Sequence, residues 1–180
     1  MVYSLSPTRS LVWGGLAATV LVLNQVGVLD SLLGLDSPAQ ASGQVEVQDG
    51  TFAEAEAMAR QHLNAFVAQA EQRPDGWNNM ALQVEFADGP DVERIWVEQF
   101  TRVQGDLFRG TLVSDGATID EMAQGRVVTF RQGQVYDWSF QQNGRAYGYF
   151  SVRAELPSMT SARADIMRGF LADQPLPRGW

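Results

Sequence analysis

Residues 127–152 carry the clearest alternation of apolar and polar positions in the chain, V-V-T-F-R-Q-G-Q-V-Y-D-W-S-F-Q-Q-N-G-R-A-Y-G-Y-F-S-V. Runs of β-branched and aromatic residues with a period of two predict short β-strands. Asn143-Gly144 is the strongest hairpin signal, because a type I′ turn needs positive φ at both central residues. With a second turn at Gln132-Gly133, the segment predicts a three-stranded antiparallel meander.

The expected turn at Asn143-Gly144 also sets a strand register. That register pairs Trp138 with Tyr149, Phe140 with Tyr147, Asp137 with Phe150 and Val135 with Val152, and the earlier turn pairs Phe130 with Val135 and Val128 with Asp137. Because side chains alternate across a strand, one face is expected to carry Val127, Tyr136, Trp138, Phe140, Tyr147 and Tyr149, and the other Val128, Phe130, Val135, Phe150 and Val152 with Asp137. Both faces are apolar, so we expect helix on at least one side of the sheet and either partial cover or a binding role on the second.

A helical repeat of apolar residues precedes this meander. Phe52, Ala55, Ala59, Leu63, Phe66 and Ala70 recur at intervals of three and four, which predicts one amphipathic helix over residues 51–72. Thr51 and Glu54 match a capping box at its start, and Arg73-Pro74-Asp75-Gly76 ends it.

The remaining elements follow from shorter patterns. Strands are expected at residues 80–86, 94–100 and 107–113, a short helix at 115–124 and a last helix over 157–173. The fold class is therefore α+β: a mainly antiparallel sheet of about five to six strands with an N-terminal and a C-terminal helix packed on it. Residues 51–173 form one domain, and residues 174–180 are expected to be a loose tail.

The first 41 residues resemble a targeting segment. Arg9 precedes an apolar run over residues 11–23, and Ala39-Gln40-Ala41 offers the small-x-small pattern of a signal-peptidase site. The alternative is an uncleaved membrane anchor. Either interpretation predicts an exported protein, periplasmic, secreted or anchored, and residues 42–50 then form a polar linker.

Composition narrows the possible partners. The net charge of −8 argues against nucleic acid and against electrostatic attachment to anionic lipid, so a membrane is expected only through an uncleaved N-terminal segment. The chain has no cysteine and one histidine, which excludes thiolate chemistry and a multi-histidine zinc site. We therefore expect no cofactor and no metal.

Several motifs occur in the order and spacing of a known family. They are Ile95-Trp96-Val97, Phe108-Arg109-Gly110-Thr111-Leu112, Gly125-Arg126-Val127-Val128, Val135-Tyr136-Asp137-Trp138 and Gly148-Tyr149-Phe150-Ser151-Val152-Arg153. Over residues 51–156 the chain resembles the YegJ-like domain of unknown function. The resemblance implies an export signal in many members and implies no activity. Where members have an Asn-Glu-Pro-like turn after the Phe-x-Gly-x-Leu strand, this chain has Ser114-Asp115-Gly116-Ala117.

Asp137 is the most informative polar residue. The expected register places its carboxylate between two apolar side chains, where it must find hydrogen-bond donors or shift its pKa upward. It is then either a structural carboxylate, accepting backbone amides or pairing with Arg153, or a general acid or base acting with Glu98 or His62. Serine-nucleophile, phosphate-loop and dinucleotide motifs are missing from the sequence.

The aromatic residues offer a second kind of site. Trp138, Tyr136, Phe140, Tyr147 and Tyr149, with Trp96 and Arg153, form either core or a platform for a sugar ring or a partner's apolar segment. The leading hypothesis is a non-catalytic exported module that binds an envelope protein or polymer through these residues. The alternative hypothesis is a small envelope hydrolase that uses Asp137 with Glu98 or His62.

Overall fold

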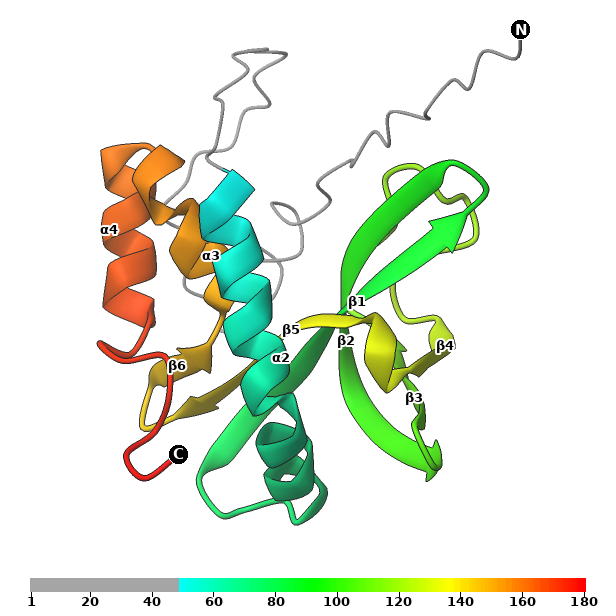
Figure 1. The fold of residues 1–180 in the computed structure, drawn as a ribbon, viewed down its shortest axis with the longest axis horizontal. Helices are drawn as coiled ribbons and strands as arrows, with labels where there is room; N and C mark the ends of the chain where they lie inside the picture. The colour runs from blue at the N-terminus through cyan, green and yellow to red at the C-terminus, as the bar shows by residue number, and fades with distance from the viewer. Residues whose placement is uncertain (1–48) are drawn as a thin grey trace, which may run out of the picture.

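The computed structural model describes residues 49–180 (Figure 1). The elements are α2 (Asp49–Glu71), β1 (Trp77–Asp88), β2 (Asp91–Gln104), β3 (Leu107–Leu112), β4 (Val127–Arg131), the 3₁₀ turn η1 (Gln132–Gln134), β5 (Val135–Gln142), β6 (Arg145–Gly148), α3 (Phe150–Glu155), the 3₁₀ turn η2 (Leu156–Ser158) and α4 (Ser161–Phe170). The predictions of a targeting segment at residues 1–41 and of most of the linker fall outside the described residues. No helix within the described part is long and apolar enough to cross a bilayer.

The six strands form one sheet in the order β4-β3-β2-β1-β5-β6, and every neighbouring pair is antiparallel. With α2 before the sheet and α3 and α4 after it, the architecture is the expected α+β fold.

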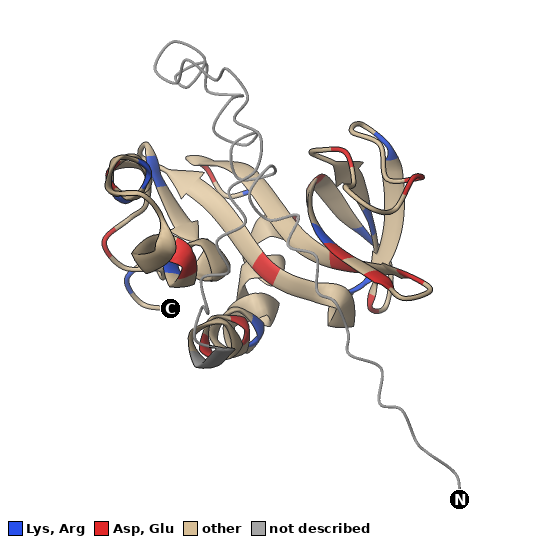
Figure 2. Ribbon diagram, turned by 90° about the horizontal axis from the view of Figure 1, so that it is seen from above, with Lys and Arg blue, Asp and Glu red and all other residues tan. Residues whose placement is uncertain are grey.

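The sheet is strongly curved, and the connection between β4 and β5 requires it. Three strands lie between β4 and β5, which in a flat sheet would separate the two by roughly 19 Å. The three residues of η1 span about 14 Å at most between Arg131 and Val135. The sheet must therefore coil to bring its β4 edge toward β5, and Figure 2 shows the bent strands from above. In η1, Gln134 Nε2 donates to the Glu85 carbonyl of β1 at 3.1 Å.

The hairpin at Asn143-Gly144 has the predicted register over its four pairs. Phe140 faces Tyr147, and the two turn residues have φ of 54° and 73°. The pairing ends at Gly148, so the expected pairs of Trp138 with Tyr149, Asp137 with Phe150 and Val135 with Val152 are wrong. Tyr149 adopts a left-handed φ of 52° and the chain turns into α3 instead of continuing as a strand.

The predicted pairing of strands across the turn at Gln132-Gly133 is also wrong. β4 pairs with β3 at the edge of the sheet, and β5 pairs with β1, so neither Phe130–Val135 nor Val128–Asp137 forms. A local two-strand interpretation missed the longer-range pairing of β5 with β1, which buries β5 on both faces.

Residues 115–124 form a loop instead of the expected helix. Glu93 of β2, only 1% exposed, lies beneath this loop and takes up its free amides. Its Oε1 accepts the backbone N–H of Ala117 at 2.6 Å, the hydroxyl of Thr118 at 2.9 Å and the Thr118 backbone N–H. A buried carboxylate thus satisfies donors that a helix would have left free at its first turn.

α2 covers one face of the sheet with its predicted apolar stripe. The buried stripe residues are Phe52, Ala55, Ala59, Leu63, Phe66 and Ala70, joined by Val67. The indole of Trp138 donates to the Ala59 carbonyl at 2.9 Å and stacks on the Phe66 ring at 4.6 Å between centroids. The helix begins at Asp49, two residues before the expected start, so Thr51 lies inside it and is not its N-cap.

α4 packs on the opposite face, and α3 lies beside α2, with Phe150 and Ala154 in the core beneath α2 and Val152 turned toward the second face. Trp96 of β2 lies in a buried cluster with Tyr149 at the turn into α3, Val152 of α3 and Met167 of α4. The Trp96 and Tyr149 rings lie 5.0 Å apart. The second apolar face is therefore closed by helix and is not left open.

The C-terminal residues pack against the domain, although the sequence predicts a loose tail. Trp180 lies 5.7 Å from the ring centroids of both Trp77 and Trp138. The Pro175 carbonyl accepts the Gly148 N–H at 2.8 Å. The last residues thus close the end of the core beside β6.

Replacing Trp180 by alanine is expected to lower the free energy of unfolding by about 1–2 kcal/mol, because a half-buried indole loses apolar contact and aromatic packing. Urea denaturation of the variant beside Arg178→Ala, an exposed neighbour, measures the effect. Equal stability of both variants and the wild-type chain would show that the tail is loose.

Candidate functional site

Asp137 and Trp138 point to opposite faces of β5. Trp138 faces Leu82 in the core beneath α2, whereas Asp137 faces Gln83 beneath α3. The Asp137 carboxylate is fully buried. Its Oδ1 accepts the Trp138 N–H at 2.7 Å, and its Oδ2 accepts the Ser151 N–H at 2.8 Å and the Ser151 hydroxyl at 2.6 Å. These bonds fasten the first turn of α3 to β5.

Burial raises the pKa of Asp137 to about 6, while the hydrogen bonds from Ser151 and Trp138 act in the opposite direction. The donors are backbone amides and one hydroxyl, all from within the fold. This geometry is that of a carboxylate that accepts backbone amides.

The three residues of the hydrolase hypothesis do not come together. Glu98 faces Ala81, whose partner on β5 is Ser139, two residues from Asp137. Two strand spacings of about 10 Å in total and an offset of about 7 Å along the strand separate the two acids. His62 lies on α2, which covers the opposite face of the sheet.

The expected aromatic platform is not a surface. Trp138, Tyr136, Phe140, Tyr149 and Trp96 are each at most 3% exposed, and only Tyr147 is half-buried, stacked 5.1 Å from Phe140. The helices on both faces account for this, with the Arg94 guanidinium 3.4 Å above the Tyr136 ring. Of the two alternatives for these rings, core and platform, the burial of β5 on both sides corresponds to core.

Arg153 binds backbone carbonyls and forms no hydrogen bond to Asp137 among the described contacts. Its guanidinium donates to Gly148 at 2.8 Å, Ala172 at 2.9 Å and Ala146 at 3.2 Å. Partial burial lowers its pKa. The side chain thus ties α3 to β6 and to the segment after α4.

A different region of the sheet is open. β1 and β2 pair from Asp88–Asp91 down to Ala81–Glu98, and no pairing between them continues beyond that point. Residues 77–80 of β1 stay with β5, and residues 99–104 of β2 stay with β3. We call this divergence the fork, and Figure 1 shows the two strands separating there.

A backbone irregularity opens the fork on each side. The β1–β5 register shifts between Asn78 and Ala81, and the β2–β3 register shifts between Glu98 and Thr101. Asn79 and Gln99, inside these two bulges, have left-handed φ of 49° and 50°. Bulges bend a strand and re-aim its side chains, so each strand turns away from the other.

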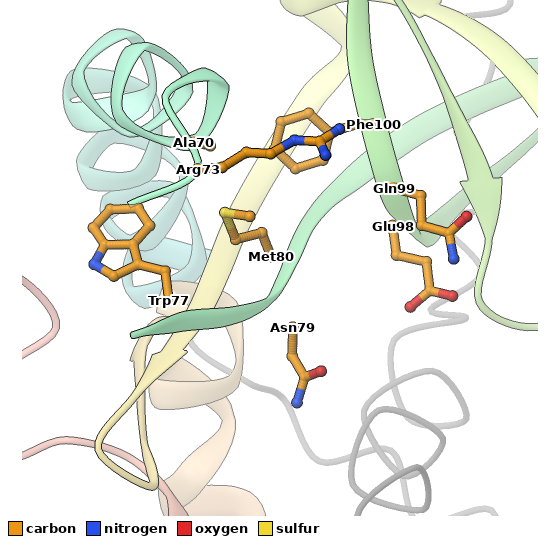
Figure 3. A pocket seen from close by; sticks show the side chains of 8 residues that line it. All are labelled: Ala70, Arg73, Trp77, Asn79, Met80, Glu98, Gln99 and Phe100. Atoms are coloured by element: carbon orange, nitrogen blue, oxygen red, sulfur yellow. The ribbon is translucent and has the colours of Figure 1, made fainter. Parts of the chain in front are cut away.

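The space in the fork is a cleft of about 900 Å³, here called the fork cleft (Figure 3). Its lining residues are Ala70 and Arg73 from the end of α2, Trp77, Asn79 and Met80 from β1, and Glu98, Gln99 and Phe100 from β2. Volumes of roughly 300–1,000 Å³ are typical of ligand sites. The lining offers one cation, one carboxylate, two amides and an apolar floor, and the described residues form no ion pair with Arg73 or Glu98.

Gly110 of β3 leaves the space that the bulge of β2 occupies at the fork. A Cβ at this position would lie 2.5 Å from Val97 Cγ1, 3.0 Å from the Glu98 carbonyl oxygen and 3.2 Å from the Phe100 Cα. The β2 bulge therefore packs directly on a glycine backbone. Sequence reasoning named Glu98 but missed the cleft, and the signal available was Gly110, since an isolated glycine within a strand marks a bulge or a close backbone approach.

Comparison with known proteins matches residues 49–169 to the family described as "Uncharacterized protein conserved in bacteria (DUF2314)". No curated protein and no solved structure matches the chain.

The stability of the protein is expected to fall as the pH rises from about 4 to about 6. The folded-state pKa of Asp137 lies above its usual value of 3.8, so the folded chain binds the additional proton in that interval, and ionisation costs on the order of 3 kcal/mol. Urea denaturation across this range for the wild type and for Asp137→Asn isolates the contribution of this group. As pH rises, the free energy of unfolding of the wild type should fall relative to that of Asp137→Asn. A constant difference between the two would contradict the assignment.

Gly110→Ala is expected to destabilise the domain by about 1–3 kcal/mol, because the added methyl group overlaps the β2 bulge. Amide chemical shifts of Gln99 and Phe100 should move as well. Gly133→Ala is the matched control, since nothing lies within 4 Å of a Cβ there and its φ is not positive. If Gly110→Ala leaves stability and those shifts unchanged, the bulge does not depend on the glycine.

Proposed function

Given that the chain belongs to the family of uncharacterized proteins conserved in bacteria (DUF2314), we propose that it is a non-catalytic binding module of the cell envelope and that the fork cleft is its ligand site. The buried aromatic residues of β5 are core in this proposal, and the ligand contacts are made by Arg73, Asn79, Glu98 and Gln99.

The observation that carries the proposal is the backbone of the fork cleft. Three of its lining residues, Arg73, Asn79 and Gln99, have positive φ without being glycine. Each such conformation costs on the order of 1–3 kcal/mol and is concentrated at ligand clamps and active sites. Packing alone would be served as well by glycine at these positions, whereas a site needs the side chains that they carry.

The polar groups of the cleft support binding over catalysis by the predicted residues. Arg73 is exposed and Glu98 is half-buried. Neither takes part in an ion pair among the described residues, so both charges are available to a ligand. The alternative, an envelope hydrolase using Asp137 with Glu98 or His62, gains no support from a carboxylate that is sealed beneath α3.

The location in the envelope rests on the sequence. Arg9, the apolar run after it and Ala39-Gln40-Ala41 support export of the domain, and the net charge of −8 supports a protein or polymer partner over nucleic acid. The motifs shared with the YegJ-like domain support the same proposal and add no activity to it.

Retention of envelope components tests the proposal. The wild-type chain, immobilised and exposed to envelope proteins and to envelope polymers in separate experiments, should retain at least one component about ten-fold more than Arg73→Gln/Glu98→Gln, because that double variant removes both charges of the cleft.

Arg168→Gln is the control, because Arg168 lies on α4 in an exposed pair with Asp165, remote in the fold from the fork. Circular dichroism of each variant verifies folding. Retention that is equal for wild type and the double variant would remove the fork cleft as the ligand site.

A further inference from the structure

Resting on the proposed function, we infer that the ligand of the fork cleft is an extended polypeptide segment of another protein, which pairs as an added strand with the free edge of β2. The edge runs from Gln99 to Gln104, and β3 occupies its other side. Three features point to that ligand: the free backbone of this edge, the packing of the nearby aromatic rings within the protein, and the charges of the cleft.

The backbone of the fork carries the first step. β1 and β2 are neighbours in the sheet, yet residues 77–80 and 99–104 face the fork without a strand between them. Backbone N–H and C=O groups at such an edge are obligatory hydrogen-bonding groups and form a ready template for another strand. An extended peptide satisfies those of residues 99–104 in sequence, as in the β-augmentation mode of recognition.

The exposure of the β2 edge agrees with a site that is used. Gln99, Thr101, Arg102, Val103 and Gln104 are all exposed, and Val103 is a large apolar side chain with 57% exposure. Natural sheets usually blunt a free edge with proline, inward charges or a covering element. Here Arg102 pairs with Glu71 of α2 at 2.7 Å, and the other residues of the edge stay accessible beside a cleft that can hold the side chains of an added strand.

The aromatic rings favour a peptide over a sugar polymer. Trp77 is the only tryptophan that lines the fork cleft, and its ring is already stacked 3.6 Å from Phe140 and packed 5.7 Å from Trp180. Phe100 lies 6.0 Å from Phe66. Sugar rings are recognised largely through a free aromatic face, and these faces are occupied within the protein.

The charges specify the segment further. Arg73 comes from the end of α2 and Glu98 from β2, so the cleft presents one cation and one carboxylate from different elements (Figure 3). A complementary segment carries an acidic and a basic side chain, with an apolar residue for the floor made by Met80 and Phe100. Such pairing sets register and selectivity more than affinity.

The chain's own linker does not reach this position. The fork cleft lies at the C-terminal end of α2, whose 23 residues extend for about 35 Å. Residues 42–48, fully extended, cover about 25 Å at most. Residues 42–48 are therefore not the segment that enters the fork.

Selection from a random-peptide display library tests the inference. The purified full chain is the target, and Arg73→Gln/Glu98→Gln is used for counter-selection. We expect extended peptides with acidic, basic and apolar residues that bind the wild type and Arg168→Gln alike, and bind the double variant about ten-fold more weakly. In the bound state, the amide resonances of residues 99–104 should shift.

N-methylated versions of a selected peptide separate strand pairing from side-chain contacts. In an added strand only alternate amides face the edge, so methylation of one alternate set should weaken binding about ten-fold per amide and methylation of the other set should leave it unchanged. Equal binding of both sets, or a selection that yields no peptide, overturns the inference.

The outcomes distinguish this inference from the function on which it rests. A polymer retained through the fork cleft, with no peptide selected, overturns the peptide ligand and leaves the binding site standing. Self-association of the wild type in sedimentation that is abolished by the double variant, again with no peptide selected, identifies a second copy as the occupant and also overturns it. If the double variant retains envelope components as well as the wild type does, both proposals are overturned.

Discussion

The structure depends on the burial of β5 on both faces. Trp138 donates to the Ala59 carbonyl of α2 on one side, and Asp137 accepts the Ser151 amide and hydroxyl of α3 on the other. A single strand thus holds both α2 and α3 through adjacent residues. Because each buried polar group would be costly without its partner, these hydrogen bonds also define where α2 and α3 must lie.

The same arrangement explains why the most prominent sequence features lie in the core. The aromatic residues of β5 fill the space beneath α2, and Asp137 holds the start of a helix that follows the hairpin directly. Gly148 makes that change of direction possible, since it has φ of 71° and a Cβ there would lie 2.1 Å from the Trp138 carbonyl oxygen. The chain turns from strand to helix at the point where a longer hairpin would have run on.

The fork cleft has the opposite character. Its features are an interruption of pairing, two bulges and left-handed residues with polar side chains, instead of additional packing. Regular strand pairing is interrupted where β1 and β2 separate. Departures of this kind concentrate at sites of function, and Gly110 in the neighbouring strand shows that the surrounding fold accommodates them.

The sequence by itself determined the α+β class, the apolar stripe of α2, the approximate positions of β1, β2 and β3, and the register of the Asn143-Gly144 hairpin. These features follow from periodicity and turn chemistry, which act over a few residues. Only the tertiary structure decided that β5 pairs with β1 and not with β4, that Phe150–Glu155 is a helix, that Glu93 holds residues 115–124 as a loop, and that Trp180 packs on the core. The reason is physical: each of these depends on a partner distant in the sequence, and an alternating strand pattern is the same whether its second face meets solvent, a helix or a ligand.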